Sequence, residues 1–440
     1  VNPHVQFQLA FALGEFADDE VASAIAQLMQ KNADNQIVMN AALTSVGNNA
    51  HLVADKVLSK QEYRRSSGGR AVLEQLAVVL GSSKEETHVA YLLSSCLDSS
   101  IEFAVQQSVL AGLGEGLNRR GSSLQKLVAA AVTSDSIRNS FRESFERAIN
   151  KATDTDAAEA ERLAAVQLLR FNSSDGIVDS LASLLSARES QQIQLAAVDS
   201  LLGQSDPSSS EPLVKNWSTF SPVVRRNIIV GLVSNKSRIP TLFDALESDV
   251  IKSSDIDRDI KQQLLQSQDA NTKQLAQKWL DAEIDSDRAK VVENYQDVLD
   301  LESNDARGFA VFKKRCAVCH RVGETGNAIA PDLNSVQNKS EADLLISILD
   351  PNREAQPNFN VYSVITEQGQ VITGIIKSET TASLTLQQAG GKSQVILRSN
   401  VDVLRSTGLS LMPEGLEKDL SKQDLADVIR FVKSIKPLEK

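Results

Sequence analysis

The sequence predicts a mainly α-helical protein, in which an α-solenoid of helical hairpins precedes a smaller helical domain with an antiparallel β-sheet insertion. Three observations support this fold class. An apolar pattern returns about every 33 residues, with glycine at the corresponding position in the first four units, and after a blurred stretch it returns with a period of about 32. A charged segment then interrupts the pattern. Period-two, β-branched segments follow at about 358–407. A chain of 440 residues can bury more than one core.

The repeated units predict stacked pairs of helices. Gly14, Gly47, Gly81 and Gly114 occupy one corresponding position. Around them, apolar residues at i, i+3, i+4 and i+7 are followed by a polar or glycine break and by a second apolar helix. One hairpin cannot bury its own apolar stripe, so neighbouring hairpins must cover it. The architecture resembles the HEAT-repeat family.

We predict structural roles, and no metal-binding or catalytic role, for the methionine, cysteine and histidine side chains of this array. Met29, Met39 and Cys96 fall in apolar helical runs, so we expect them in the core. Histidines such as His51 and His88 have no second His, Cys or carboxylate at the spacing of a metal site. We therefore predict that they are ordinary surface or half-buried residues.

Charge is distributed unevenly along the chain. The formal net charge is -11, yet residues 301–440 carry 17 basic and 17 acidic residues, which leaves 29 basic and 40 acidic residues before them. Phosphate binding needs a basic surface, so this composition argues against a nucleic-acid partner. No apolar run approaches the roughly 20 residues of a membrane-spanning helix, so we expect no transmembrane segment in this chain.

The first residues predict an amphipathic helix, without a basic-then-apolar secretory signal before it. We therefore expect Val1 to lie inside a longer protein, so the missing signal says little about the compartment. The last repeat helix should end near Asp281. A helical linker at 286–303 is then expected to lead into a domain at 304–440.

Two of the three cysteines and one of the four histidines lie within five positions, at Cys316, Cys319 and His320. A zinc site needs four ligands, and no second Cys or His pair is present. A thioredoxin-like pair would follow a strand in a βαβ unit, which is not visible here. In covalent haem attachment, two thiols add to the vinyl groups and the adjacent histidine binds iron. We therefore predict one covalent haem c.

The second axial ligand is predicted to be a methionine, because a haem that carries electrons at a raised potential favours a soft sulfur. Met412 is the methionine that falls in a loop, next to Pro413. It lies about 90 residues beyond His320. Period-two segments with turns at Gly369 and at Gly390 explain this separation as an inserted antiparallel sheet.

Residues around the cysteine motif resemble the class I cytochrome c family. In that family a helix carries Gly-x-x-x-aromatic-x-x-x-Cys-x-x-Cys-His, which Gly308 and Phe312 match on one helical face. The resemblance implies that the small residue lets the C-terminal helix, here the one with Phe431, cross closely. It also implies that Pro331 presents its backbone carbonyl to the ring of His320, which sets the nitrogen that binds iron.

The order of these motifs, with a β insertion before the methionine loop, resembles the PVC-type CxxCH haem-binding proteins. In that family the haem domain often follows helical repeats and an upstream β-propeller similar to a sugar dehydrogenase. The resemblance implies a periplasmic or other extracytoplasmic cytochrome that passes electrons from a donor dehydrogenase to an acceptor. It assigns no catalytic residue to this chain. Two alternatives stay open: an interaction scaffold with a structural haem, and a peroxidase-like haem enzyme with an open distal site.

Overall fold

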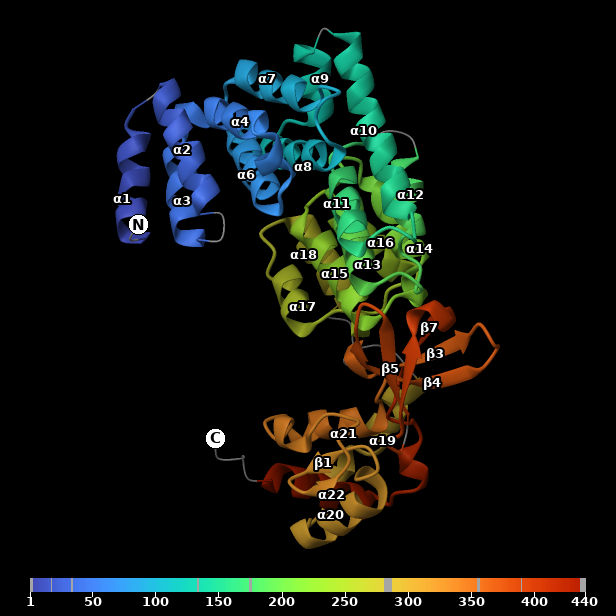
Figure 1. Cartoon of the computed structure of the whole chain (residues 1–440). Coiled ribbons are helices and arrows are strands. Elements are labelled where there is room, and N and C mark those ends of the chain that lie inside the picture. The colour runs from blue at the N-terminus through green and yellow to red at the C-terminus, as the bar shows by residue number, and fades with distance from the viewer. Residues whose placement is uncertain are drawn as a thin grey trace. The chain divides into compact units, whose positions relative to one another are not determined.

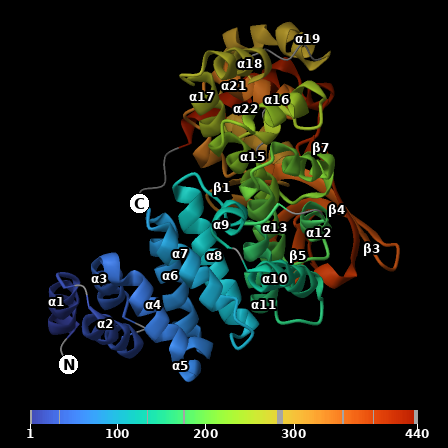
Figure 2. The same cartoon turned by 90° about the horizontal axis from the view of Figure 1, so that it is seen from above.

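The chain divides into two compact units. Figures 1 and 2 show the chain coloured by residue number, from blue at the N-terminus to red at the C-terminus. The first contains Val1–Leu184 and Asp199–Asp206, and the second contains Leu185–Val198 and Pro207–Lys440. As predicted, the fold is mainly helical with small antiparallel sheets. This computed structural model describes residues 3–16, 18–32, 35–132, 134–173, 176–280, 287–353, 357–388 and 390–435.

No helix within these described ranges is long and apolar enough to cross a membrane.

Helices of the first unit pack against helices one to three places along the chain, as α1 does on α3, α2 on α4, and α6 on α8. The described helices have the following bounds: α1 (Pro3–Gly14), α2 (Asp19–Lys31), α3 (Gln36–Ser45), α4 (Ala50–Ser59), α5 (Gln61–Arg65), α6 (Ser67–Ser82), α7 (Glu86–Cys96), α8 (Phe103–Arg119), α9 (Leu124–Ala131), α10 (Asp135–Thr153), α11 (Glu159–Leu169), α12 (Ile177–Ser183) and α13 (Gln191–Gly203), whose residues belong partly to each unit.

The repeated glycines mostly mark close approaches between successive helices. A Cβ atom on Gly81 in α6 would lie 2.7 Å from the carbonyl oxygen of Leu113 in α8, and one on Gly114 would overlap the ring of Phe171. Gly47 differs, because it occupies a short turn with a φ of 40° and open space around it. The period therefore has a packing basis at Gly81 and Gly114, while the α-solenoid arrangement stays a prediction.

Predicted core residues of the first unit are buried: Met29 and Cys96 are 0% exposed and Met39 is 7% exposed. Burial also raises the pKa of the Cys96 thiol. His51 and His88 are half-buried, and their rings stack with centroids 3.7 Å apart. The sequence did not indicate this contact between the two histidine rings, because the residues lie 37 positions apart.

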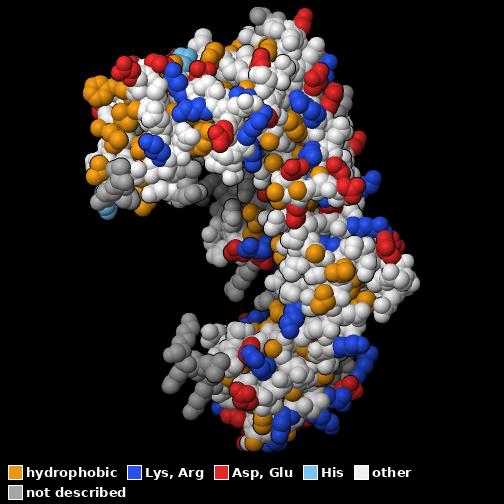
Figure 3. Space-filling view, in the orientation of Figure 1, with side chains coloured by type: hydrophobic (Ala, Val, Ile, Leu, Met, Phe, Trp, Pro, Cys, Tyr) orange, Lys and Arg blue, Asp and Glu red, His pale blue; other side chains and the backbone are white. Residues whose placement is uncertain are grey.

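Helix α1 forms as predicted but is not amphipathic, since apolar side chains point to several sides. Val5, Leu9 and Phe11 are 57%, 46% and 42% exposed, and the following Phe16 is 62% exposed. Apolar side chains gather over α1 in the space-filling view (Figure 3). These four residues leave apolar side chains exposed on more than one side of the N-terminal segment.

The second unit contains further helices, a five-stranded sheet and the helices around the cysteine motif (Figure 1). Helices α21 and α22 both begin with capping boxes, in which Ser340 pairs with Asp343 and Ser421 pairs with Asp424. The helices have the following bounds: α14 (Glu211–Lys215), α15 (Pro222–Ser234), α16 (Ile239–Glu247), α17 (Arg258–Leu265), α18 (Ala270–Leu280), α19 (Asp287–Asn294), α20 (Asp305–Val311), α21 (Glu341–Leu349) and α22 (Lys422–Ser434).

The predicted β insertion is confirmed as an antiparallel sheet with the strand order β6-β5-β4-β3-β7. Its side chains alternate between a buried face, which includes Tyr362 and Val364, and a more exposed face. The expected turns at Gly369 and Gly390 have positive φ angles of 77° and 88°. The strands are β3 (Asn360–Thr366), β4 (Val371–Glu379), β5 (Ser383–Gln387), β6 (Ser393–Leu397) and β7 (Val401–Ser410), besides a two-stranded hairpin of β1 (Arg321–Val322) and β2 (Thr325–Gly326).

The sheet and the turn after β6 contact helical segments of their own unit. The hydroxyl of Tyr362 donates to the carbonyl of Phe220 at 3.1 Å, and Arg398 donates to the carbonyl of Ala187 at 3.0 Å. Arg398 also pairs with Glu379 at 2.8 Å, and these two side chains are 2% and 4% exposed. Burial raises the pKa of Glu379, although hydrogen bonds and the charge of Arg398 oppose the increase.

Replacing Arg398 by methionine should lower the free energy of unfolding by about 3–5 kcal/mol, because a buried carboxylate would lose its partner. Arg405 is exposed on strand β7, which follows the turn with Arg398, so Arg405→Met is the matched control and should change stability by less than about 0.5 kcal/mol. Denaturant unfolding followed by circular dichroism measures both. Equal stability losses in the two variants would contradict a role for the buried pair.

Candidate haem site

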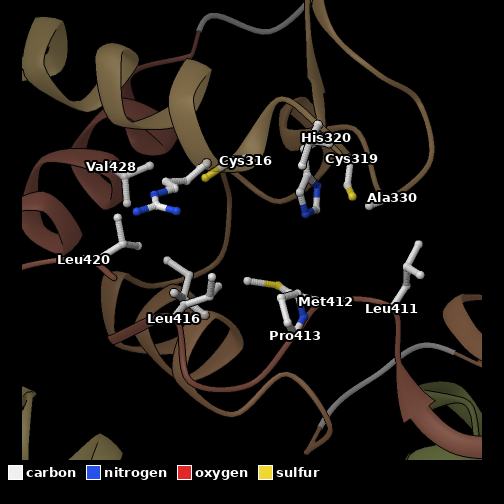
Figure 4. Close-up of a pocket in the computed structure, with 13 residues that line it drawn as sticks. Cys316, Cys319, His320, Ala330, Leu411, Met412, Pro413, Leu416, Leu420 and Val428 are labelled. Carbon is white, nitrogen blue, oxygen red and sulfur yellow. The ribbon is translucent and has the colours of Figure 1, made fainter. Parts of the chain in front are cut away.

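The cysteine motif forms a tight turn at the end of α20. A π-helical turn, Phe312–Cys316, continues that helix. The backbone N–H groups of Cys319 and His320 then donate to the carbonyl of Cys316 at 3.0 and 2.9 Å. Cys316, Cys319 and His320 consequently line one cavity (Figure 4).

Gly308 lies where α20 crosses α22. A Cβ atom on Gly308 would overlap the carbonyl oxygen of Asp427 and would lie 2.7 Å from the Cβ atom of Phe431. Phe312 is 0% exposed, and its ring centroid lies 5.4 Å from that of Phe431. The close crossing expected at Gly308 is therefore present. Gly308 and Phe312 are not among the described residues that line the cavities, so a direct role toward a cofactor stays a prediction for both.

Asp427 strengthens this crossing by joining α22 to the start of α20. Its carboxylate accepts the backbone N–H of Asn304 at 2.7 Å and the Nε–H of Arg307 at 2.6 Å. Burial alone would raise the pKa of Asp427, but these hydrogen bonds outweigh it, and the pKa lies below its usual range. The stability that Asp427 contributes is present above its unfolded pKa and is lost as the pH falls through the folded pKa.

Replacing Gly308 by alanine should destabilise the domain by about 1–3 kcal/mol, because the added methyl group would force two helices apart. Alanine stabilises a helix relative to glycine by up to about 1 kcal/mol. A net loss of stability in the variant would therefore come from the steric overlap where the two helices cross. Lys314 is exposed in the same segment, and Lys314→Ala serves as the control. A Gly308→Ala variant as stable as the original protein in denaturant titration would contradict this account.

The ring of His320 is hydrogen-bonded to the backbone of Pro331, a contact that the resemblance to class I cytochromes c implies. The Nδ1 atom of His320 lies 2.8 Å from the carbonyl oxygen of Pro331. A carbonyl only accepts, so Nδ1 carries the proton and Nε2 keeps a free lone pair. Burial lowers the pKa of His320, against the effect of this hydrogen bond, so the ring is neutral at pH 7. Backbone bonds from Ile329 and Ala330 to the carbonyl of Cys319 hold the loop in place.

Met412 follows strand β7 in a loop on the other side of the cavity. Its side chain is half-buried, and its backbone N–H donates to the hydroxyl of Ser410 at 3.2 Å. Figure 4 shows the sulfur of Met412 facing the ring of His320 across the open space, with Leu411 and Pro413 beside it. The structure therefore places a thioether opposite an imidazole.

Two adjoining cavities, of about 660 and 1130 Å³ with their open mouths included, lie between these side chains. Pockets for cofactor-sized ligands are mostly apolar with a few placed polar groups. Burial raises the pKa of Cys316 to about 11, with a further contribution from Cys319, so Cys316 is a neutral thiol at pH 7. These features fit a flat apolar group with a metal at its centre. Both cavities are lined by Cys316, His320, Ala330, Ile348, Leu411, Met412 and Val428.

Part of this site lies in a segment that is similar to a known family. A cytochrome c family model matches residues 306–371. The matched segment contains the cysteine motif, His320 and Pro331, and it ends before Met412. No curated protein matches the chain. The chain thus contains a cytochrome c-like domain, and because that family binds haem c covalently, the match supports a haem-binding, electron-transfer role.

Sequence reasoning missed the side chains that hold the methionine loop. Asn352 bonds to Ser410 and to Glu414, and Arg288 bonds to Glu417. These are ordinary polar residues without a recurring spacing, so no motif could have indicated them.

Proposed function

We propose that this chain is a monohaem c-type cytochrome that transfers electrons. The observation that carries the proposal is the meeting of Cys316, Cys319, His320 and Met412 around one apolar cavity (Figure 4). In this proposal the two cysteines tether the haem, His320 and Met412 are its axial ligands, and Pro331 orients His320. The haem, when bound, would supply a one-electron iron couple.

The protein's own contribution is a mostly apolar cavity wall, to which Leu416, Leu420 and Val428 contribute. Apolar walls exclude water, and the thioether of Met412 faces the side where a peroxidase would need an open position. Both features favour an electron carrier over a haem enzyme.

The helical repeats are proposed to act as a scaffold for redox partners. Repeat arrays bind through extended surfaces, and exposed apolar patches often mark protein contacts. The exposed apolar side chains of Val5, Leu9, Phe11 and Phe16 support such a role, as does the acidic excess before residue 301. The proposed partners are an electron-donor dehydrogenase, for which a β-propeller on the same full-length chain is one candidate, and an electron acceptor.

We also propose a periplasmic or other extracytoplasmic location, because bacterial haem c is attached outside the cytoplasm. The proposed domains are a HEAT-like α-solenoid at 1–285, a helical linker at 286–303 and the haem domain at 304–440. Val292 and Val298 of this linker belong to the same core as Leu345 and Ile429.

A redox titration followed by visible spectroscopy tests the proposal. We expect one haem per chain, a six-coordinate spectrum and a reversible one-electron transition. An iron that cannot be reduced reversibly would favour the scaffold with a structural haem. A five-coordinate iron that reacts rapidly with peroxide would favour the enzyme.

A further inference from the structure

We propose that Arg288 is a positioning residue for Met412, because it ties the methionine loop to the end of helix α21 through Glu417. This inference rests on the proposed function, since it takes Met412 as a ligand of the haem iron. Arg288 lies in α19, before the segment that matches the cytochrome c family, so it adds to the site a residue from outside the matched residues.

Arg288 binds two elements at once. Its Nη1 and Nη2 atoms donate to the two carboxylate oxygens of Glu417 at 2.9 and 2.8 Å, and its Nε atom donates to the carbonyl of Leu349 at 2.8 Å. Leu349 is the last residue of α21. The side chains of Arg288 and Glu417 are only 16% and 10% exposed. Two parallel hydrogen bonds fix the direction as well as the distance of the carboxylate.

Glu417 lies in the short turn Leu416–Lys418, which follows Met412 in the loop. Leu416 lines the same cavity as Met412, so the turn forms part of the cavity wall. A displacement of Glu417 would therefore move both the wall and the chain that carries Met412. The hydrogen bonds that Glu417 accepts from Arg288 also lower its pKa, so the carboxylate is charged at pH 7.

The start of the loop has its own attachment. Asn352, just beyond α21, accepts the backbone N–H of Ser410 at 2.7 Å and donates to Glu414. Asn352 thus holds the residues that flank Met412, and Arg288 holds the turn beyond it. Both attachments lead to the end of α21, whose Ile348 also lines the cavity. The two attachments therefore fix the position of the methionine loop relative to α21, the helix that forms one wall of the site.

The contacts of Arg288 should therefore determine how often Met412 moves away from its position opposite His320. An external ligand binds only when Met412 has moved away, so its apparent affinity scales with the open fraction. Loss of the Arg288 clamp should raise that fraction. A purely structural role for Arg288 would lower stability without changing access to the iron.

The test uses the full chain with haem attached and imidazole as the external ligand. Arg288→Gln and Glu417→Gln should each raise the apparent affinity for imidazole about tenfold, as expected for a tenfold larger open fraction. Both should weaken the near-infrared sulfur-to-iron band while haem content per chain stays unchanged. Lys418→Gln removes one charge from the same turn at an exposed position and should change neither readout. The exchanged pair, Arg288→Glu with Glu417→Arg, should restore part of the original behaviour.

Hydrogen exchange of the Met412 amide provides a readout that does not depend on iron chemistry, and it should accelerate in Arg288→Gln. If that variant does not fold, Arg288→Lys keeps the charge without the two-pronged contact and gives the same comparison. Unchanged imidazole affinity and unchanged exchange, together with lower stability, would overturn the positioning role. A sulfur-to-iron band missing from the original protein would instead refute Met412 ligation, and the inference would fail with it.

Discussion

Replacing Cys316 and Cys319 together by alanine should abolish covalent haem attachment. The original protein should keep its haem after denaturation, because the thioether bonds survive loss of the fold. In the double variant any remaining haem would be held by axial ligation and apolar contacts alone, so it should separate from the denatured chain. Haem staining after denaturing electrophoresis and mass spectrometry of the extracted chain measure this difference.

Cys96 offers a matched control for this experiment. It is the remaining cysteine of the chain, lies in α7 and is fully buried, with a hydrogen bond to the carbonyl of Leu93. Cys96→Ala should keep the covalent haem and lose only a little stability. Complete recovery of haem from the original protein by acid–acetone extraction would contradict the attachment prediction.

The haem-free double variant should also be less stable than the loaded protein. An apolar cavity between α22 and the methionine loop would then lack its occupant. A group that binds only the folded state stabilises it, and here that contribution would be lost. We expect a lower thermal midpoint than in Cys96→Ala, measured at equal protein concentration.

Short-range spacing explains why part of the site could be predicted from the sequence. Cys316, Cys319 and His320 lie within five positions, and a helical turn is enough to bring them together. The role of Pro331 was implied by the resemblance to class I cytochromes c, and a single loop returns its carbonyl to the ring of His320. The same resemblance implied a helix crossing at Gly308, and α22 crosses there.

Long-range contacts between ordinary residues could not be predicted in this way. Arg288 and Glu417 are 129 positions apart, and Tyr362 and Phe220 are 142 apart. Neither pair has a periodic pattern, and arginine and glutamate are ordinary surface residues. Alternation in the strands predicted the inserted sheet itself, but it could not indicate that the segment with Phe220 contacts Tyr362.

Replacing Met412 by alanine should change the iron site more than any other single substitution outside the cysteine motif. If Met412 is the distal ligand, the oxidised protein has a weak near-infrared band from sulfur-to-iron charge transfer, and the variant should lose it. Cyanide should then bind much faster, because no side chain has to leave first. The reduction potential should fall, since a thioether stabilises the reduced iron, and axial ligands as a class tune haem potentials over about 0.8 V.

Two further variants separate ligation from general damage. Met29 is fully buried in α2 of the first unit, so Met29→Leu should leave the band, the potential and the cyanide rate unchanged. Met412→His should restore a six-coordinate iron that resists cyanide but should not restore the sulfur band. This pattern follows from geometry, because the loop between Leu411 and Pro413 places whatever residue stands at position 412 opposite His320 (Figure 4). An unchanged spectrum in Met412→Ala would mean that the distal position is held by another residue or is open, and the electron-carrier proposal would lose its main support.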